Sequence, residues 1–241
     1  MSRGLFDLPA PLFDWVDRHL FASLPAAAAV AVWALLAGVA TLELYRLLSP
    51  QARIERLKHA TREAQQRLSA YDGDLDGAWP LIRRLLGVSL QRVAIVLPAT
   101  LVAAYPVIAV LVWASNTWGH HFPDDPGSVA VTAEAPFDAR WVAAAGEAPH
   151  VQARTPGGEL VLDRPVAVPV TVLHKREWWN WLVGNPAGYL PADAPVERID
   201  IDLPRRELFA AGPAWLRGWE AVFIPVLFVS ALAYKAIRRI H

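Results

Sequence analysis

Three long stretches without a charged residue constrain the fold more than any other feature of the sequence. They are Leu24–Leu42, Val93–Ser115 and the shorter Ala221–Tyr234, which Trp215 and Trp219 precede. At about 1.5 Å of rise per residue, nineteen helical residues reach about 28 Å, close to the thickness of a bilayer's hydrocarbon core. We therefore predict three transmembrane helices, the alternative being buried helices of a soluble core.

The segment before the first stretch does not have the composition of a cleavable signal peptide. It is 23 residues long and sets Arg3 and Arg18 against Asp7, Asp14 and Asp17. A signal peptide needs a short basic region followed by a small-residue cleavage site. We expect the first apolar helix to be retained in the mature protein.

The same N-terminal segment carries apolar residues at helical spacing. With its acidic residues on the other side, this pattern predicts an amphipathic helix on the outer leaflet; an irregular leader is the alternative. The apolar positions are Leu5, Leu8, Leu12, Val16 and Leu20, with Phe6, Phe13 and Phe21 beside them.

The placement of charges predicts the orientation of the chain. Residues 46–92 carry nine Lys or Arg and five acidic residues, and residues 235–241 carry three basic residues and no acid. Residues 116–218 carry nine basic and thirteen acidic residues. The positive-inside rule then places 46–92 and the C-terminus in the cytoplasm, and the N-terminus and 116–218 outside a bacterial inner membrane.

The cytoplasmic segment has the pattern of a helical hairpin. Ser49-Pro50 marks a helix start, and Asp72–Gly77 is rich in turn residues. A solvated linker helix is the alternative, but two arms joined by a short turn bury each other's apolar residues. The first arm carries a heptad seam and the second an apolar stripe: Ile54, Leu57, Thr61, Ala64, Leu68 and Tyr71, then Leu81, Ile82, Leu85, Leu86 and Leu90.

The outer segment changes to short, Val-rich runs separated by Pro and Gly, such as the turn Thr155–Gly158. This pattern predicts a small β-sandwich of about eighty residues. The predicted strands are Ser128–Ala135, Ala139–Ala143, His150–Arg154, Glu159–Leu162, Val166–Leu173 and Val196–Leu203.

Three tryptophans stand close together in the outer segment, at Trp178, Trp179 and Trp181. Tryptophan is enriched both at membrane interfaces and at protein interfaces. These side chains are candidates for the bilayer interface, for packing of the β-domain, or for partner binding.

The sequence lacks the patterns of an enzyme or a metal protein. It has no cysteine, which excludes disulfides, thiolate metal sites and a cysteine nucleophile. It shows no phosphate-binding loop and no nucleophile elbow. His120 and His121, followed by Asp124 and Asp125, are the nearest approach to a metal motif, but adjacent histidines rarely face one ion. We expect no catalytic residue, no metal, no cofactor and, because 23 basic residues balance 23 acidic ones, no DNA binding.

The order of parts resembles the YidC/Oxa/Get superfamily of membrane-protein insertases, which includes archaeal YidC-like proteins and the third subunit of the ER membrane protein complex. The likeness covers about residues 26–115, with Ala221–Tyr234 as the matching third span. Two short segments are also similar in sequence: Tyr45–Gln51, just before the basic hairpin, and Gln91-Arg92, which leads to Pro98. The outer β-domain is an addition to the family's core.

The resemblance implies a polar groove, open to the cytoplasm and to lipid, that receives the polar part of a client helix. In this sequence the closest cations are Arg46 and Arg92, both at the cytoplasmic ends of their spans. Glu43 lies three residues before Arg46, a spacing that allows the two to pair on one helix face. The predicted groove residues are Arg46, Arg92, Glu43, Gln91, Thr100 and Tyr105.

The sequence as a whole predicts an α-helical membrane protein with three transmembrane helices, a cytoplasmic helical hairpin and a small extracytoplasmic all-β domain. The expected function is an insertase whose partners are the bilayer, client membrane proteins and a ribosome. A scaffold subunit of a larger inner-membrane complex is the alternative, and a membrane enzyme ranks third. The expected parts are 1–23 (amphipathic helix), 24–48 (first span), 49–92 (hairpin), 93–115 (second span), 116–214 (β-domain), 215–237 (third span) and 238–241 (cytoplasmic tail).

Overall fold

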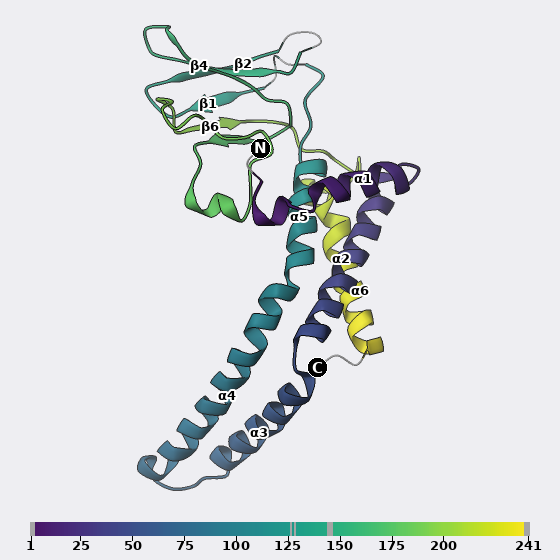
Figure 1. The fold of residues 1–241 in the computed structure, drawn as a ribbon, viewed down its shortest axis with the longest axis vertical. Helices are drawn as coiled ribbons and strands as arrows, with labels where there is room; N and C mark the ends of the chain where they lie inside the picture. Colours follow the sequence, from purple (N-terminus) through teal and green to yellow (C-terminus); the bar gives the residue numbers. More distant parts are fainter. Residues whose placement is uncertain (1–2, 126, 128, 144–146, 239–241) are drawn as a thin grey trace. The chain divides into compact units, whose positions relative to one another are not determined.

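A computed structural model describes residues 3–125, 127, 129–143 and 147–238 of the chain. The chain divides into two compact units: unit 1 combines Met1–Trp33 with Ile108–Ile224, and unit 2 combines Ala34–Val107 with Pro225–His241. Figure 1 shows long helices and a small β-rich part. The described residues include three helical stretches long and apolar enough to cross a membrane, as the sequence predicted: Ala26–Leu48, Leu75–Trp118 and Glu220–Arg238.

The predicted helical hairpin is present in unit 2. Helix α2 (Ala26–Leu48) ends just before Ser49-Pro50, and α3 (Gln51–Ser69) packs against α4 (Leu75–Ala103). Ile54 and Ala64, both from the predicted seam, are buried between the arms. The hairpin is therefore held by the seam that the sequence indicates.

The turn of the hairpin is fixed by a helix cap. The Asp74 carboxylate accepts a hydrogen bond from the Gly77 backbone N–H at 3.2 Å, which satisfies one free donor at the start of α4. Farther along α4, the predicted apolar stripe is only partly buried, since Leu86 and Leu90 are exposed. A single neighbouring helix cannot cover the whole stripe.

The second apolar stretch consists of two consecutive helices. Helix α4 ends at Ala103 and α5 (Tyr105–Trp118) begins two residues later. Pro106 lies in the first turn of α5, where it has no N–H to donate and its ring excludes the carbonyl of the preceding turn. The expected continuous helix over 93–115 is therefore interrupted at residue 104.

Unit 1 contains two three-stranded antiparallel sheets, in the orders β1-β6-β5 and β2-β3-β4. The two sheets contribute side chains to one apolar core, which includes Val151, Leu173 and Ile199, as expected of a small two-layer domain (residues 129–203, the β-domain). The strands are β1 (Val131–Ala133), β2 (Asp138–Val142), β3 (His150–Arg154), β4 (Leu160–Pro165), β5 (Val172–His174) and β6 (Arg198–Ile201).

The predicted strand Val166–Leu173 is wrong over most of its length, because β5 begins only at Val172. Pro169 lies in this segment and has no N–H for a strand ladder. Val166 and Val170 are nevertheless buried, so the segment fills the core, and isolated backbone hydrogen bonds such as Val166 N–H to the Pro149 carbonyl at 2.7 Å take the place of a strand ladder. Of the predicted strand 128–135, residue 128 lies outside the described residues.

The N-terminal helix α1 (Ala10–Leu20) forms where an amphipathic helix is predicted, after the 3-10 turn η1 (Leu5–Asp7). Its acidic side is not simply solvated. Asp14 accepts a hydrogen bond from Trp113 Nε1 at 2.7 Å, and Asp17 accepts one from Trp33 Nε1 at 3.0 Å. The aspartates thus tie α1 to α5 and to the start of α2.

The two indoles belong to an aromatic cluster in unit 1. Trp33 and Trp113 have ring centroids 4.8 Å apart, Phe13 and Phe21 meet Trp33 edge-on, and Trp118 meets Trp113 edge-on. All three tryptophans are buried. Burial of these large rings, together with the hydrogen bonds from Trp33 and Trp113 to the two aspartates, holds the N-terminal segment in place.

The third apolar helix begins later than its expected range of 215–237. The 3-10 turn η4 (Ala214–Leu216) precedes α6 (Glu220–Arg238), and residues 239–241 of the expected tail lie outside the described residues. Trp215 is exposed, whereas Trp219 is buried and packs against Phe223, with ring centroids 5.5 Å apart.

Candidate functional site

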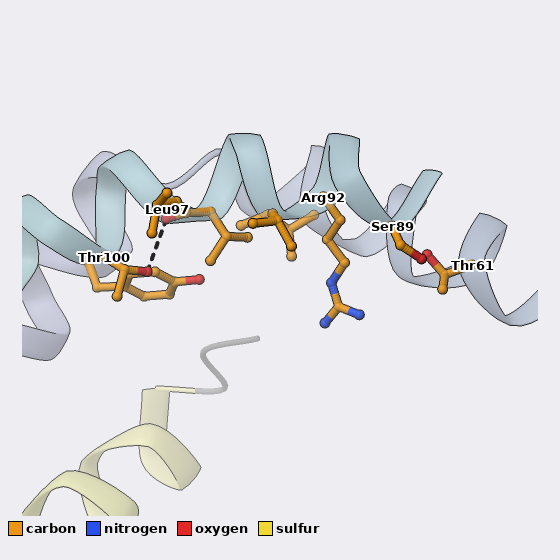
Figure 2. Close-up of a pocket in the computed structure, with 9 residues that line it drawn as sticks. Thr61, Ser89, Arg92, Leu97 and Thr100 are labelled. Carbon is orange, nitrogen blue, oxygen red and sulfur yellow. Dashed lines mark hydrogen bonds between the residues drawn. The ribbon is translucent and has the colours of Figure 1, made fainter. Parts of the chain in front are cut away.

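A pocket of about 380 Å³ lies within unit 2, between the C-terminal part of α2, the first half of α3 and the middle of α4 (Figure 2). Helix α2 ends and α3 begins beside this part of α4, which brings the three helices together. Nine residues line this hairpin pocket: Tyr45, Ile54, Thr61, Ser89, Arg92, Val93, Val96, Leu97 and Thr100.

Arg92 supplies the positive charge of the hairpin pocket. Figure 2 shows its side chain extending from α4, with the guanidinium directed away from the helix. Its neighbours Val93, Val96 and Leu97 form an apolar wall on the same helix. Among the described residues no carboxylate or other acceptor bonds to Arg92, so its five N–H donors are free for a bound group.

Two of the hydroxyl groups in the pocket are held by their own helices. Thr61 Oγ1 donates to the Leu57 carbonyl at 2.8 Å, and Thr100 Oγ1 donates to the Val96 carbonyl at 3.0 Å. A hydroxyl that donates in this way still offers its oxygen as an acceptor. The pocket therefore presents a cation, weak acceptors and an apolar wall, which together suit a polar or acidic group carried on an apolar segment.

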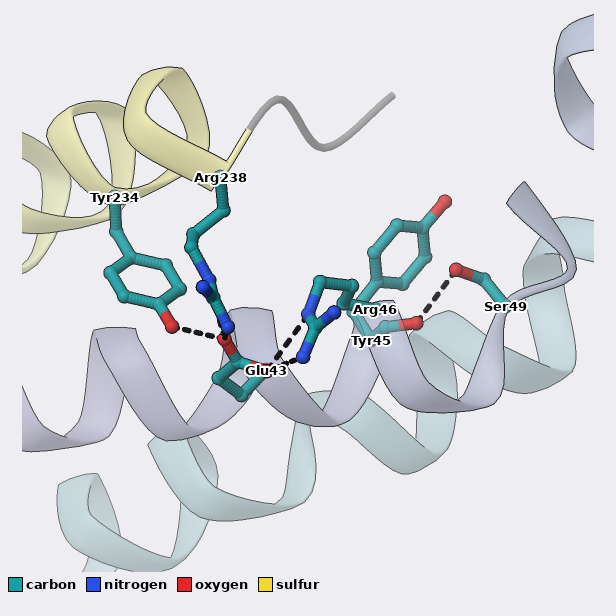
Figure 3. A network of polar contacts seen from close by, with 6 residues as sticks. All are labelled: Glu43, Tyr45, Arg46, Ser49, Tyr234 and Arg238. Atoms are coloured by element: carbon teal, nitrogen blue, oxygen red, sulfur yellow. Dashed lines mark hydrogen bonds and ion pairs between the residues drawn. The ribbon is translucent and has the colours of Figure 1, made fainter. Parts of the chain in front are cut away.

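A second polar group in unit 2 surrounds Glu43 (Figure 3). Glu43 pairs with Arg46 on its own helix, with Nη2–Oε2 at 2.8 Å, as the three-residue spacing predicts. It also pairs with Arg238 of α6, with Nη2–Oε1 at 2.9 Å, and accepts a hydrogen bond from the Tyr234 hydroxyl. One carboxylate thus joins α2 to α6.

The two candidate cations consequently differ. Arg46 is paired with Glu43, so its charge is already partly satisfied, whereas Arg92 faces the hairpin pocket. Thr100 also lines that pocket, but Gln91 and Tyr105 are not among its lining residues.

Seven of the nine pocket residues are absent from the groove predicted from the sequence: Tyr45, Ile54, Thr61, Ser89, Val93, Val96 and Leu97. Ile54 and Thr61 belong to the heptad seam of the first arm. A threonine within an apolar seam was the signal that could have identified them, because a polar residue there faces the partner helix.

The tryptophan group in unit 1 splits into packed and exposed members on the 3-10 turn η3 (Trp178–Trp181). Trp179 stacks on His174, with ring centroids 5.5 Å apart, and its Nε1 donates to the Glu177 carboxylate at 2.8 Å. Trp178 and Trp181 are 81% and 55% exposed. Trp179 therefore packs on the β-domain, and the other two remain available to a neighbour.

The histidine pair after α5, His120 and His121, is the nearest approach to a metal motif in the sequence. The backbone of His120 pairs with that of Arg205 in an isolated antiparallel β-bridge. The pKa of His120 lies below its ordinary value, mainly because burial disfavours the charged imidazole and secondly because of the Arg205 charge. No three His, Asp or Glu side chains of the described residues are grouped closely enough to hold a metal ion.

Comparison of the chain with protein-family models, with characterised proteins and with solved structures finds no match.

Proposed function

We propose that the chain is a bacterial inner-membrane protein in which α2, the α4–α5 stretch and α6 cross the bilayer. Long apolar side chains such as Leu101 of α4 and Phe228 and Leu232 of α6 are exposed, which suits contact with lipid. The basic excess of residues 46–92 supports a cytoplasmic hairpin, with the N-terminus and the β-domain in the periplasm.

Within that placement, the function we favour is a membrane-protein insertase or assembly factor of the YidC/Oxa type. The observation that carries the proposal is the guanidinium of Arg92, which has no partner among the described residues and lies beside the apolar wall of the hairpin pocket. A client helix has apolar residues that fit the wall and polar flanks that need a partner. Arg92 would hold such a flank while the apolar part enters lipid.

The physical task is to lower the cost of moving polar groups through hydrocarbon. A charged residue at the centre of a membrane helix costs about 2.5–3.5 kcal/mol on insertion scales. A charge-assisted hydrogen bond contributes about 1.5–3 kcal/mol, so a single contact to Arg92 offsets much of that cost. The proposal needs no covalent catalysis and no cofactor.

The hairpin is the proposed contact with a ribosome, a nascent chain or a client. Its first arm exposes several charged side chains on the faces away from α4, including Arg53, Arg56 and Arg62. Such a basic surface suits an anionic partner, such as the ribosome surface at the point where a nascent chain emerges.

The test is insertion of a small single-span client into liposomes that contain the purified chain. We expect Arg92→Leu to reduce the insertion rate about tenfold, which corresponds to about 1.4 kcal/mol, and Arg92→Lys to keep part of it. Arg84→Leu is the matched control, because it removes the same charge from an exposed position of α4 that does not line the pocket. Full activity of Arg92→Leu, or equal losses in both leucine variants, contradicts the proposed role of Arg92.

A scaffold subunit of a larger membrane complex is the second candidate. It is favoured by the exposed Trp178 and Trp181 and by the pairing of Arg46 with Glu43, which leaves fewer free cations for a client. Native purification distinguishes the two functions. A stoichiometric partner that is lost when both tryptophans are changed to Ser supports the scaffold.

A further inference from the structure

The N-terminal segment exposes large apolar side chains along one side. They lie on η1, on α1 and in the residues between them, and most are more than half exposed: Leu5, Leu8, Leu12, Trp15 and Leu20. Large apolar side chains exposed together on one segment indicate a binding surface.

The orientation of α1 is fixed by hydrogen bonds on its opposite side. The Asp14 and Asp17 carboxylates are bonded to the buried indoles of Trp113 and Trp33. Rolling the helix to bury its leucines would break both charge-assisted bonds and leave two indole N–H groups unsatisfied. The leucine side is therefore held outward.

A second segment, far away in sequence, joins this surface. The Asp7 carboxylate is buried and accepts hydrogen bonds from the backbone N–H groups of Gly4 at 3.0 Å and Gly184 at 2.6 Å. The Phe6 N–H donates to the Leu182 carbonyl at 2.9 Å. These bonds attach η1 to the chain directly after η3, which carries the exposed Trp178 and Trp181.

We infer that η1, α1 and η3 form one lipid platform that lies in the headgroup layer of the outer leaflet. In Figure 1 the purple η1 and α1 and the green turn of η3 lie along the same edge of unit 1, away from the sheets. The inference rests on the membrane placement of α2 proposed above.

Lipid is the occupant that the connection to α2 favours. Only residues 21–25 separate α1 from α2. Five residues extend at most about 17 Å, so α1 lies close to the membrane surface if α2 crosses it. The exposed residue types, leucine and tryptophan, are those that enter the interfacial layer. Arg18 on the same helix pairs with Asp14 at 3.8 Å but is 74% exposed, so its guanidinium can also meet phosphate groups.

The test uses spin labels in lipid nanodiscs, for which the cysteine-free chain is well suited. Single labels are attached through Leu12→Cys and Trp178→Cys, and each label's collisions with oxygen and with a water-soluble nickel reagent give its depth. Arg140→Cys, on an exposed position of β2, is the aqueous control, and Leu101→Cys, on an exposed position of α4, is the control for a membrane span.

We expect the Leu12 and Trp178 labels to lie near the depth of the lipid phosphates, the Arg140 label in water and the Leu101 label in hydrocarbon. If the Leu101 label lies in hydrocarbon but the other two match Arg140, the platform is wrong and the membrane placement stands. If the Leu101 label is also in water, the membrane placement itself fails. Labels at Leu12 and Trp178 that are shielded from both reagents indicate a second protein chain on this surface and also overturn the proposal.

Discussion

The hydrogen bond between Asp14 and Trp113 allows a quantitative test of how strongly α1 is held against α5. Trp113 Nε1 donates to the Asp14 carboxylate at 2.7 Å, the indole is 3% exposed and the Asp14 side chain is 41% exposed. A hydrogen bond to a charged acceptor contributes about 1.5–3 kcal/mol, and partial exposure of the carboxylate places this one near the lower limit. Asp14→Ala should therefore cost about 1.5 kcal/mol.

This cost should appear as undocking of α1 rather than as global unfolding, because the bond between Asp17 and Trp33 and the aromatic cluster remain. About 1.5 kcal/mol corresponds to roughly a tenfold increase in the population of the undocked helix. Hydrogen exchange of the α1 amides, measured by mass spectrometry on the full chain in nanodiscs, reports that population directly. Asp14→Asn keeps a neutral acceptor and should recover about half of the loss.

A double-mutant cycle with Trp113→Phe isolates the bond from the other effects of each change. We expect a coupling energy of about 1–1.5 kcal/mol between the two positions. Asp138→Ala, at an exposed position of β2, is the control and should leave exchange in α1 unchanged. An unchanged exchange rate of α1 in Asp14→Ala, or a coupling energy below about 0.3 kcal/mol, contradicts the role assigned to this hydrogen bond.

Three further predictions follow from single contacts. A Cβ on Gly38 would lie 2.9 Å from Ser230 Oγ of α6, so Gly38→Ala should cost about 1 kcal/mol in thermal unfolding, and Ser230→Ala in the same chain should restore most of it. Burial, then the Arg205 charge, lowers the pKa of His120 below its ordinary 6.5, so protonation favours the unfolded chain. Stability against denaturant should therefore fall as pH drops below about 6.5, and His120→Asn should flatten that dependence. Asp7→Ala removes the acceptor for two backbone amides, so proteolysis near η1 should become faster, while Asp7→Asn should stay closer to the parent chain.

Features that depend on neighbouring residues were predicted well from the sequence. The boundary at Ser49-Pro50, the turn before Leu75 and the pairing of Glu43 with Arg46 each involve residues a few positions apart. The hairpin followed because an apolar seam on a charged helix needs a second arm to cover it. The long apolar helices followed from length and composition alone.

Features that depend on distant partners could not be predicted in the same way. The sequence shows that α1 is amphipathic, but its acidic side faces indoles 16 and 99 residues away, and no periodicity encodes that contact. Likewise Arg46 and Arg92 look alike in sequence. They differ in the structure because Glu43 pairs with Arg46 and with Arg238, 195 residues farther along the chain.

The position of Glu43 has a consequence for biosynthesis. The Tyr234 hydroxyl that bonds to this carboxylate is 191 residues downstream, so at roughly 5–20 residues per second it emerges about 10–40 s after Glu43 has been made. During that interval Arg46 is the partner that the structure provides for Glu43 on the same helix. On the membrane placement proposed above, the first apolar helix therefore enters the bilayer with its carboxylate already neutralised, and arrival of the last helix completes the contact rather than starting it.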